Sequence, residues 1–214
     1  MTISKIVLSV LALSLIATAG LPAPFGPGLP VPAQEKQDAK KAFVADKDGV
    51  IAIEAEHFHG KADKDPHKWV AVKEPAGFSG DGAMEARPND DTNNNEDFVT
   101  LSPRLDYTVK FAKAGKYRVW VRGYGKTDAD NSVHAGLDGK AVDSSDRIGD
   151  FPTEEWAWYN GTHDNDPAVI EIKDAGTHTI NLWMREDGFI IDKLLLTQDE
   201  KYTPKDKGPA ETRE

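Results

Sequence analysis

The chain has no cysteine, so neither disulfide bonds nor lipid attachment through cysteine is available to it. It also has no nucleophile elbow, phosphate-binding glycine loop, dinucleotide fingerprint or His-Glu-x-x-His zinc motif. Basic residues are outnumbered: 26 Lys and Arg face 36 Asp and Glu, which argues against nucleic acid as a partner. No stretch of a dozen residues has convincing helical periodicity. The informative features are therefore the strands and the acidic and aromatic side chains on them.

The longest apolar run lies at the start of the chain. Lys5 precedes the run 6–16, and residues 17–19 fit the small-residue cleavage site of an export signal, with 31–33 as a second possible cleavage point. The run is too short to cross a membrane comfortably, and an uncleaved anchor is the alternative. We predict a signal peptide and Pro/Gly-rich segment over residues 1–33. The protein is then secreted or periplasmic, with no stable membrane span in its mature form.

Composition divides the rest of the chain into three parts. Residues 34–43 form a polar, charged linker. Residues 44–204 carry nearly all of the Trp, Tyr and Phe, and they are numerous enough for one domain with an ordinary core. Residues 205–214 form a charged tail with few apolar residues, which we expect to be loosely ordered. The prediction is a single folded domain, monomeric, between two polar segments.

Alternation of apolar and polar residues predicts antiparallel strands. Residues 105–111 and 117–122 alternate on either side of an Ala-Gly turn, which predicts a hairpin. Residues 168–172 and 178–185 repeat the pattern around a second glycine-containing turn and predict another hairpin. Short strands at this spacing predict an all-β fold, a two-sheet antiparallel jelly-roll sandwich.

Three acidic residues stand on the opening and closing strands. Glu54 and Glu56 end the run that starts at residue 50, and their i, i+2 spacing puts both side chains on one face. Asp192 interrupts the apolar run 189–196, where a bare carboxylate would be costly to bury. If the two strands lie side by side, the three carboxylates converge. Such an oxygen cluster suits Ca²⁺, and we predict a structural calcium ion there.

Two tryptophans lie opposite the aliphatic residues of their own strands. Trp120 and Trp183 share that side with hydrogen-bonding residues, which are Arg118, Arg122, Asn181 and Arg185. A sandwich hides one face of each sheet, so these indoles are predicted on an outer or concave surface. Aromatic faces beside polar side chains suit sugar rings, whose C–H faces are apolar and whose rims carry hydroxyls. The alternative is that loops cover both indoles as a satellite core.

Two further segments offer ligand contacts. Trp156 and Trp158 share a face of a short strand between two loops, and we expect Trp158 to join the core while Trp156 meets the ligand. Burial of both is the alternative. Arg185 and Asp187 belong to a charged turn between the last two strands, where they could grip sugar hydroxyls at a loop tip. An ordinary polar hairpin is the other interpretation.

The order and spacing of several motifs over about residues 44–210 resemble carbohydrate-binding modules of families 6 and 35, which are galactose-binding-like jelly rolls. The motifs are Ile53-Glu54-Ala55-Glu56-His57-Phe58, Gly77-Phe78-Ser79-Gly80-Asp81-Gly82, Tyr107-Thr108-Val109, Ala114-Gly115-Lys116-Tyr117-Arg118-Val119-Trp120-Val121-Arg122, Ala175-Gly176-Thr177-His178 and Phe189-Ile190-Ile191-Asp192. The segment 183–188 is similar to a subgroup attached to secreted polysaccharide-degrading enzymes. The resemblance implies a structural calcium held by Glu54, Glu56 and Asp192, with backbone carbonyls completing the site.

The same resemblance implies a sugar site at the loop rim. Trp156 takes the place of the family's stacking aromatic, and Trp69 or Phe78 takes the place of a second one from an early loop. In many relatives an Asn just ahead of the last strand binds the sugar, whereas this chain has Asp187 and Gly188 there. This departure leaves the type of sugar open.

These observations predict a secreted, non-catalytic carbohydrate-binding protein, an accessory of the kind that accompanies polysaccharide-degrading enzymes. One alternative is a cell-surface protein-interaction module that uses the same aromatic face. Another is a small glycoside hydrolase or lyase, since such enzymes need two carboxylates flanking the bond. Four acids supply such a pair by count, namely Glu154, Glu155, Glu186 and Asp187.

Overall fold

A computed structural model describes residues 41–214, and these belong to one compact unit. The predicted signal peptide and most of the predicted linker lie outside the described residues. The strands, in chain order, are β1 (Val50–Glu54), β2 (Gly60–Ala62), β3 (Lys68–Val72), β4 (Ala83–Arg87), β5 (Arg104–Phe111), β6 (Gly115–Tyr124), β7 (Val133–Leu137), β8 (Lys140–Ala141), β9 (Trp156–Tyr159), β10 (Val169–Ile172), β11 (Gly176–Met184) and β12 (Ile190–Thr197). Short helical turns form at η1 (Ala55–His57), α2 (Phe98–Leu101) and η2 (Asp143–Ser145). None of the helices in this part of the chain has the length and apolar character needed to cross a membrane.

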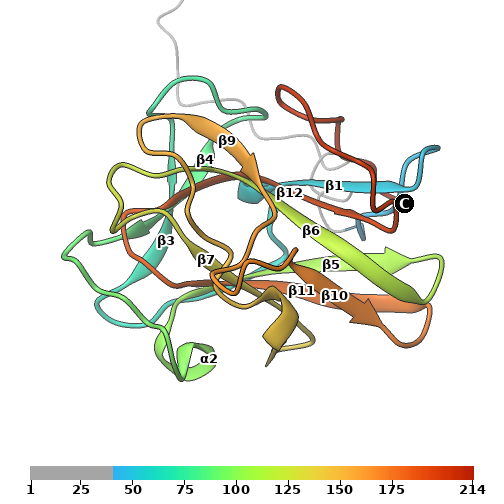
Figure 1. Cartoon of the computed structure of the whole chain (residues 1–214), viewed down its shortest axis with the longest axis horizontal. Helices are drawn as coiled ribbons and strands as arrows, with labels where there is room; N and C mark the ends of the chain where they lie inside the picture. The colour runs from blue at the N-terminus through green and yellow to red at the C-terminus, as the bar shows by residue number, and fades with distance from the viewer. Residues whose placement is uncertain (1–40) are drawn as a thin grey trace, which may run out of the picture. The chain divides into compact units, whose positions relative to one another are not determined.

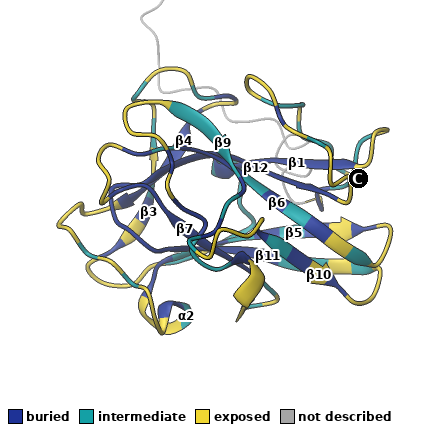
Figure 2. Ribbon diagram, in the orientation of Figure 1, coloured by how far each residue is buried: buried dark blue, intermediate teal, exposed yellow. Residues whose placement is uncertain are grey.

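The strands form two antiparallel sheets (Figure 1). In the larger sheet the order is β10-β6-β12-β4-β3, with β1 beside β12 and β9 beside β6. The smaller sheet has the order β2-β5-β11-β7-β8. Apolar side chains from both sheets meet in one core, and most of the exposed ribbon belongs to the connecting loops (Figure 2). The predicted all-β fold, a two-sheet jelly-roll sandwich, is confirmed.

The two predicted hairpins are wrong, although their strands are right. β5 and β6 belong to different sheets, and so do β10 and β11. Gly115 and Gly176 begin the second strand of each pair with φ angles of 131° and 143°, which favour glycine. Because β5 pairs with β11 and β6 with β10, the two connections form neighbouring arches across the core. Alternation could not reveal this, since paired strands and strands that face each other across a core both put every second residue inside.

Strand β12 carries an irregularity at its acidic residue. Its pairing with β6 shifts between Ile191 and Lys193, so Asp192 is the extra residue of a β-bulge. Ile191 belongs to the core, and so do Leu194 and Leu196. Strict alternation from Ile191 would turn both leucines outward. The bulge therefore lets two consecutive charged residues lie outside the core without exposing the leucines that follow.

The charged C-terminal segment 205–214 packs against the sandwich. Arg213 forms a β-bridge with Phe43, and its guanidinium lies 4.0 Å from the Phe43 ring centre. Glu211 hydrogen-bonds with His57 Nδ1 and accepts a hydrogen bond from Arg213 Nε, both at 2.9 Å. Burial raises the pKa of Glu211, but these hydrogen bonds and charges outweigh it and lower the pKa to about 2. The expectation of a loosely ordered tail is therefore wrong.

The variant Glu211→Gln should loosen this segment, because a neutral amide weakens the hydrogen bonds with His57 and Arg213. We expect a loss of about 1–2 kcal/mol in the free energy of unfolding. Amide hydrogen exchange across residues 205–214 should become faster. Urea denaturation and hydrogen-exchange mass spectrometry measure the two effects. Glu200→Gln, at an exposed position, is the matched control. Equal exchange in the two variants would contradict the anchoring role of Glu211.

Candidate functional site

The first and last strands of the sandwich are neighbours, as predicted. β1 pairs with β12 so that Glu54 lies opposite Lys193, and Glu54 Oε1 forms a buried ion pair with Lys193 Nζ at 2.7 Å. Asp192 Oδ2 forms a second buried ion pair with Arg122 Nη1 at 2.6 Å. Ser79 links the two acids, because its Oγ donates to Glu54 Oε2 and its N–H donates to Asp192 Oδ1, both at 2.6 Å. Charged residues therefore fix this strand pair from the side away from the core.

Glu56 is bound by the loop that contains Ser79. Its Oε1 accepts hydrogen bonds from the N–H groups of Asp81 and Gly82 at 2.7 and 3.2 Å. A Cβ at Gly80 would lie 2.4 Å from Glu56 Oε1, so the loop needs glycine to approach this closely. Glu56 Oε2 is buried without a hydrogen-bond partner among the described residues. Burial raises the pKa of the Glu56 carboxyl group.

Glu54, Glu56 and Asp192 do not gather into a ready metal site, because their carboxylates do not bring one oxygen each within 4.8 Å of one another. Arg122 and Lys193 already pair with two of the three acids, and the buried Glu56 Oε2 is the oxygen that a cation would satisfy. The two cationic side chains also bind the C-terminal segment. Arg122 Nε donates to the Asp206 carbonyl at 3.2 Å. Lys193 Nζ donates to the carbonyls of Lys207 and Pro209, each at 3.1 Å.

Two of the predicted sugar-binding tryptophans are sealed inside the protein. Trp183 is fully buried, with the Phe98 ring centre 5.6 Å away and Arg104 over its face. Helix α2, which carries Phe98, covers this face of the smaller sheet. Alternation within a strand does not predict that a distant helix will cover its outward-facing residues. Trp69 belongs to the core, and its Nε1 donates to the Pro103 carbonyl at 3.1 Å. The expectation that these two indoles face a ligand is therefore wrong.

Three tryptophans are half-buried on the outer face of the larger sheet, namely Trp120, Trp156 and Trp158. Trp156 Nε1 donates to the Ala76 carbonyl at 3.0 Å, and the Arg122 guanidinium lies 5.2 Å from its ring centre. Trp158 was expected in the core, but it is not part of the core. Its Nε1 instead donates to a carbonyl of the C-terminal segment at 3.0 Å, so it lies beneath that segment. Trp156 keeps a partly exposed ring.

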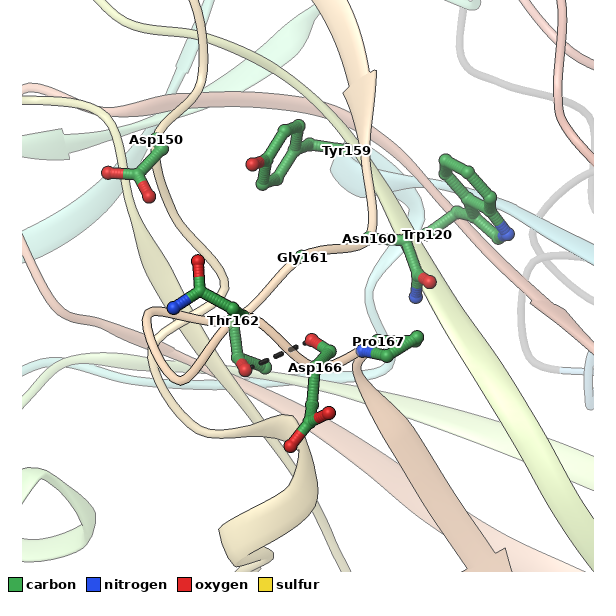
Figure 3. Close-up of a pocket in the computed structure, with 9 residues that line it drawn as sticks. Trp120, Asp150, Tyr159, Asn160, Gly161, Thr162, Asp166 and Pro167 are labelled. Carbon is green, nitrogen blue, oxygen red and sulfur yellow. Dashed lines mark hydrogen bonds between the residues drawn. The ribbon is translucent and has the colours of Figure 1, made fainter.

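A hollow of about 370 Å³ opens where β9 ends (Figure 3). Trp120 and Tyr159 line it from the paired strands β6 and β9. Asp150, Asn165 and Asp166 line it from the loops on either side of β9, and all three are exposed. In Figure 3, Asp150 and Tyr159 lie on one side, with Asp166 across from them. The volume is in the range of small-ligand sites, which is about 300–1,000 Å³.

The charged turn between β11 and β12 is buried rather than exposed at a loop tip. Arg185 Nη1 donates to Glu186 Oε1 at 2.5 Å and to Ser132 Oγ at 2.6 Å. Asp187 is fully buried, and its Oδ2 accepts the Asp90 N–H at 2.6 Å. Burial raises the pKa of Asp187. The expectation that Arg185 and Asp187 grip sugar hydroxyls is wrong, because neighbouring loops fold over both residues and bury them.

The residues that line the hollow do not stand out in the sequence. Tyr159 directly follows the two tryptophans of β9, and the acids Asp150 and Asp166 stand in the loops flanking that strand. An aromatic strand bracketed by acidic loops is therefore the signal that could have found them. The signal is weak, because a chain with 36 Asp and Glu places acids in most of its loops.

Replacing Arg185 with leucine should cost about 3–5 kcal/mol of unfolding free energy, because Glu186 would remain buried without its charged partner. The matched control is Arg147→Leu, which breaks a partly exposed pair with Asp164 at 2.8 Å. Its cost should stay below about 1 kcal/mol. Chemical denaturation of both variants measures the difference. Equal, small losses would show that the Arg185 pair is not structural.

The fold recurs in solved carbohydrate-active proteins. A GH26-CBM35 β-(1,4)-mannanase of Podospora anserina matches 74% of this chain and 29% of its own, with a TM-score of 0.51 and 16% identity. A family 35 carbohydrate-binding module from Clostridium thermocellum matches 69% of this chain and 96% of its own, with a TM-score of 0.48 and 17% identity. At the level of the fold, the first of these confirms the predicted resemblance to family 35.

A curated relative and a family model match the sequence itself. The relative is Uncharacterized protein P23 of Formosa agariphila, 29% identical over 202 residues, which are 80% of this chain and 49% of the relative. The chain therefore spans about half the length of that protein. The family model is the glycosyl hydrolase family 115 C-terminal domain, and it matches residues 42–211. The chain thus belongs to the family of glycosyl hydrolase family 115 C-terminal domains.

Proposed function

We propose that this protein is a secreted, non-catalytic carbohydrate-binding module that contacts its ligand at the hollow beside β9. The observation that carries the proposal is the placement of the aromatic Tyr159 beside the exposed carboxylates of Asp150 and Asp166 in one hollow, with Trp120 at its margin (Figure 3). Aromatic side chains suit the C–H faces of sugars, and carboxylates accept hydrogen bonds from sugar hydroxyls. The family description and the fold shared with a mannanase that contains a CBM35 part support the same class of ligand.

Trp156 offers a second aromatic contact apart from the hollow, because its side chain lies on the face of β9 opposite to that of Tyr159. Its indole N–H is already occupied by the Ala76 carbonyl. It would therefore offer a ligand its ring rather than a hydrogen bond. Such an open, shallow surface supports only modest affinity, on the order of micromolar to millimolar.

The carboxylates favour binding over hydrolysis. Of the four acids that could form a catalytic pair, Glu186 and Asp187 are buried and accept hydrogen bonds from neighbouring loops. The other two, Glu154 and Glu155, are exposed and adjacent on one loop. A glycosidase needs two carboxyl groups on opposite sides of the bond. A protein partner is also less well supported. Leu101 alone among the large hydrophobic residues of the described chain is exposed, so little apolar surface is available for docking.

Removing both carboxylates of the hollow, in Asp150→Ala/Asp166→Ala, should weaken polysaccharide binding at least tenfold, because sugar hydroxyls lose their acceptors. Affinity electrophoresis in gels that contain individual soluble polysaccharides measures the retardation. Trp156→Ala should also reduce it. The control Asp128→Ala/Glu200→Ala removes two exposed acids outside the hollow and should behave as the unmodified protein. The proposal fails if no polysaccharide retards the protein, or if the double variant is retarded equally.

We infer further that Glu54, Glu56 and Asp192 hold a structural calcium ion. The unpartnered, buried Oε2 of Glu56 supports this inference, because a cation would satisfy it. A small shift of the Gly80 loop would bring the three carboxylates around one ion and tie that loop to the first and last strands. The ion would act on stability, and the sugar-contacting residues belong to a different set.

Chelation should therefore lower the melting temperature of the protein. A ligand that binds only the folded state at a thousandfold excess over its Kd contributes about 4 kcal/mol. Glu56→Gln should remove the response to calcium, whereas Glu200→Gln should retain it. Differential scanning calorimetry with and without EDTA measures the shift. An unmodified protein that melts at the same temperature in EDTA and in calcium would show that Arg122 and Lys193 suffice to neutralise the cluster.

A further inference from the structure

A second group of metal-ligand side chains uses none of the residues proposed above to hold calcium or to line the hollow. His67, Asp90 and Asp187 come from three separate segments, which are the turn before β3, the loop after β4 and the turn before β12. His67 Nε2 lies 3.2 Å from Asp90 Oδ1 and 3.4 Å from Asp187 Oδ2. Residues far apart in the sequence thus bring one nitrogen and two oxygens together.

These separations match the spacing of ligand atoms around a zinc ion. Tetrahedral bonds of about 2.0–2.2 Å place neighbouring ligand atoms about 3.3–3.6 Å apart. The donor set also discriminates between metals. Imidazole with carboxylates suits Zn²⁺ and the other late first-row divalent ions, whereas Ca²⁺ and Mg²⁺ prefer oxygen ligands.

Hydrogen bonding to His67 cannot satisfy both acids. Its Nε2 carries at most one hydrogen, yet it lies within reach of both carboxylates. Asp187 is fully buried, and its Oδ1 has no hydrogen-bond partner within residues 41–214. A buried carboxylate with an unmet oxygen is costly, and a divalent cation beside it would offset that cost.

We propose that His67, Asp90 and Asp187 form a binding site for Zn²⁺ or a chemically similar late first-row divalent ion. The Asp90 side chain is 47% exposed, so an ion can enter from solvent and keep water in a fourth position. Thr92 Oγ1 donates to Asp90 Oδ1 at 2.7 Å, and the Asp90 N–H donates to Asp187 Oδ2 at 2.6 Å. These contacts orient the carboxylates toward the imidazole.

Titration of the chelator-treated, untagged chain with ZnCl₂ and CoCl₂ tests the site. Calorimetry should give one equivalent of bound metal, and Co²⁺ should develop the visible absorption of tetrahedral coordination. The melting temperature should rise with Zn²⁺. His67→Gln and Asp90→Asn should each weaken binding at least tenfold. The matched control His178→Gln removes a histidine that pairs with Asp138 and should bind as the unmodified protein does.

The absence of Zn²⁺ and Co²⁺ binding by the unmodified protein would overturn the assignment. Equal binding by the unmodified protein and His67→Gln would overturn it as well, since the metal would then lie elsewhere. A preference for Ca²⁺ over Zn²⁺ at these residues would overturn the choice of metal. Polysaccharide binding does not enter any of these readouts, so failure of the carbohydrate proposal leaves the metal result intact.

Discussion

Two buried ion pairs at the bulge of β12 hold three strands of the larger sheet together. Asp192 and Lys193 follow each other in the chain, and each has an opposite charge within 2.7 Å, supplied by Arg122 and Glu54. Burial of any one of these charges alone would be strongly unfavourable. The pairs therefore make the positions of β1, β6 and β12 interdependent. Carbonyls of the C-terminal segment accept hydrogen bonds from the Arg122 and Lys193 side chains, so the end of the chain belongs to the same unit.

Loops decide which outward-facing aromatics reach solvent. On the smaller sheet, α2 covers Trp183. On the larger sheet, the C-terminal segment covers Trp158, and the carbonyl of Ala76 binds the Trp156 indole. Within residues 41–214, no such segment covers the hollow at the end of β9, which Tyr159 lines. The candidate ligand surface is thus what the loops leave uncovered rather than what strand alternation points outward.

The fold class and the contact between the first and last strands were predictable because their signals are local. Alternation shows which side of a strand is buried, and Asp192 within an apolar run shows that a partner must exist. The strand with which another strand pairs is not a local property. The sequence around Gly115 and Gly176 therefore predicted hairpins where the structure has arches between the two sheets. Trp183 and Arg185 are buried by loops that are distant from them in the sequence. The periodicity of their own strand therefore does not predict their burial.

The bridge between Phe43 and Arg213 has a consequence for architecture. Because this bridge is antiparallel and the Glu214 N–H donates to the Ala42 carbonyl, polypeptide joined ahead of residue 43 and polypeptide joined behind residue 213 would leave it side by side. Inserted into a longer protein, the unit would form a side branch that adds almost no span between its flanking regions. Neighbouring modules could then stay in contact with each other while this one projects from their junction.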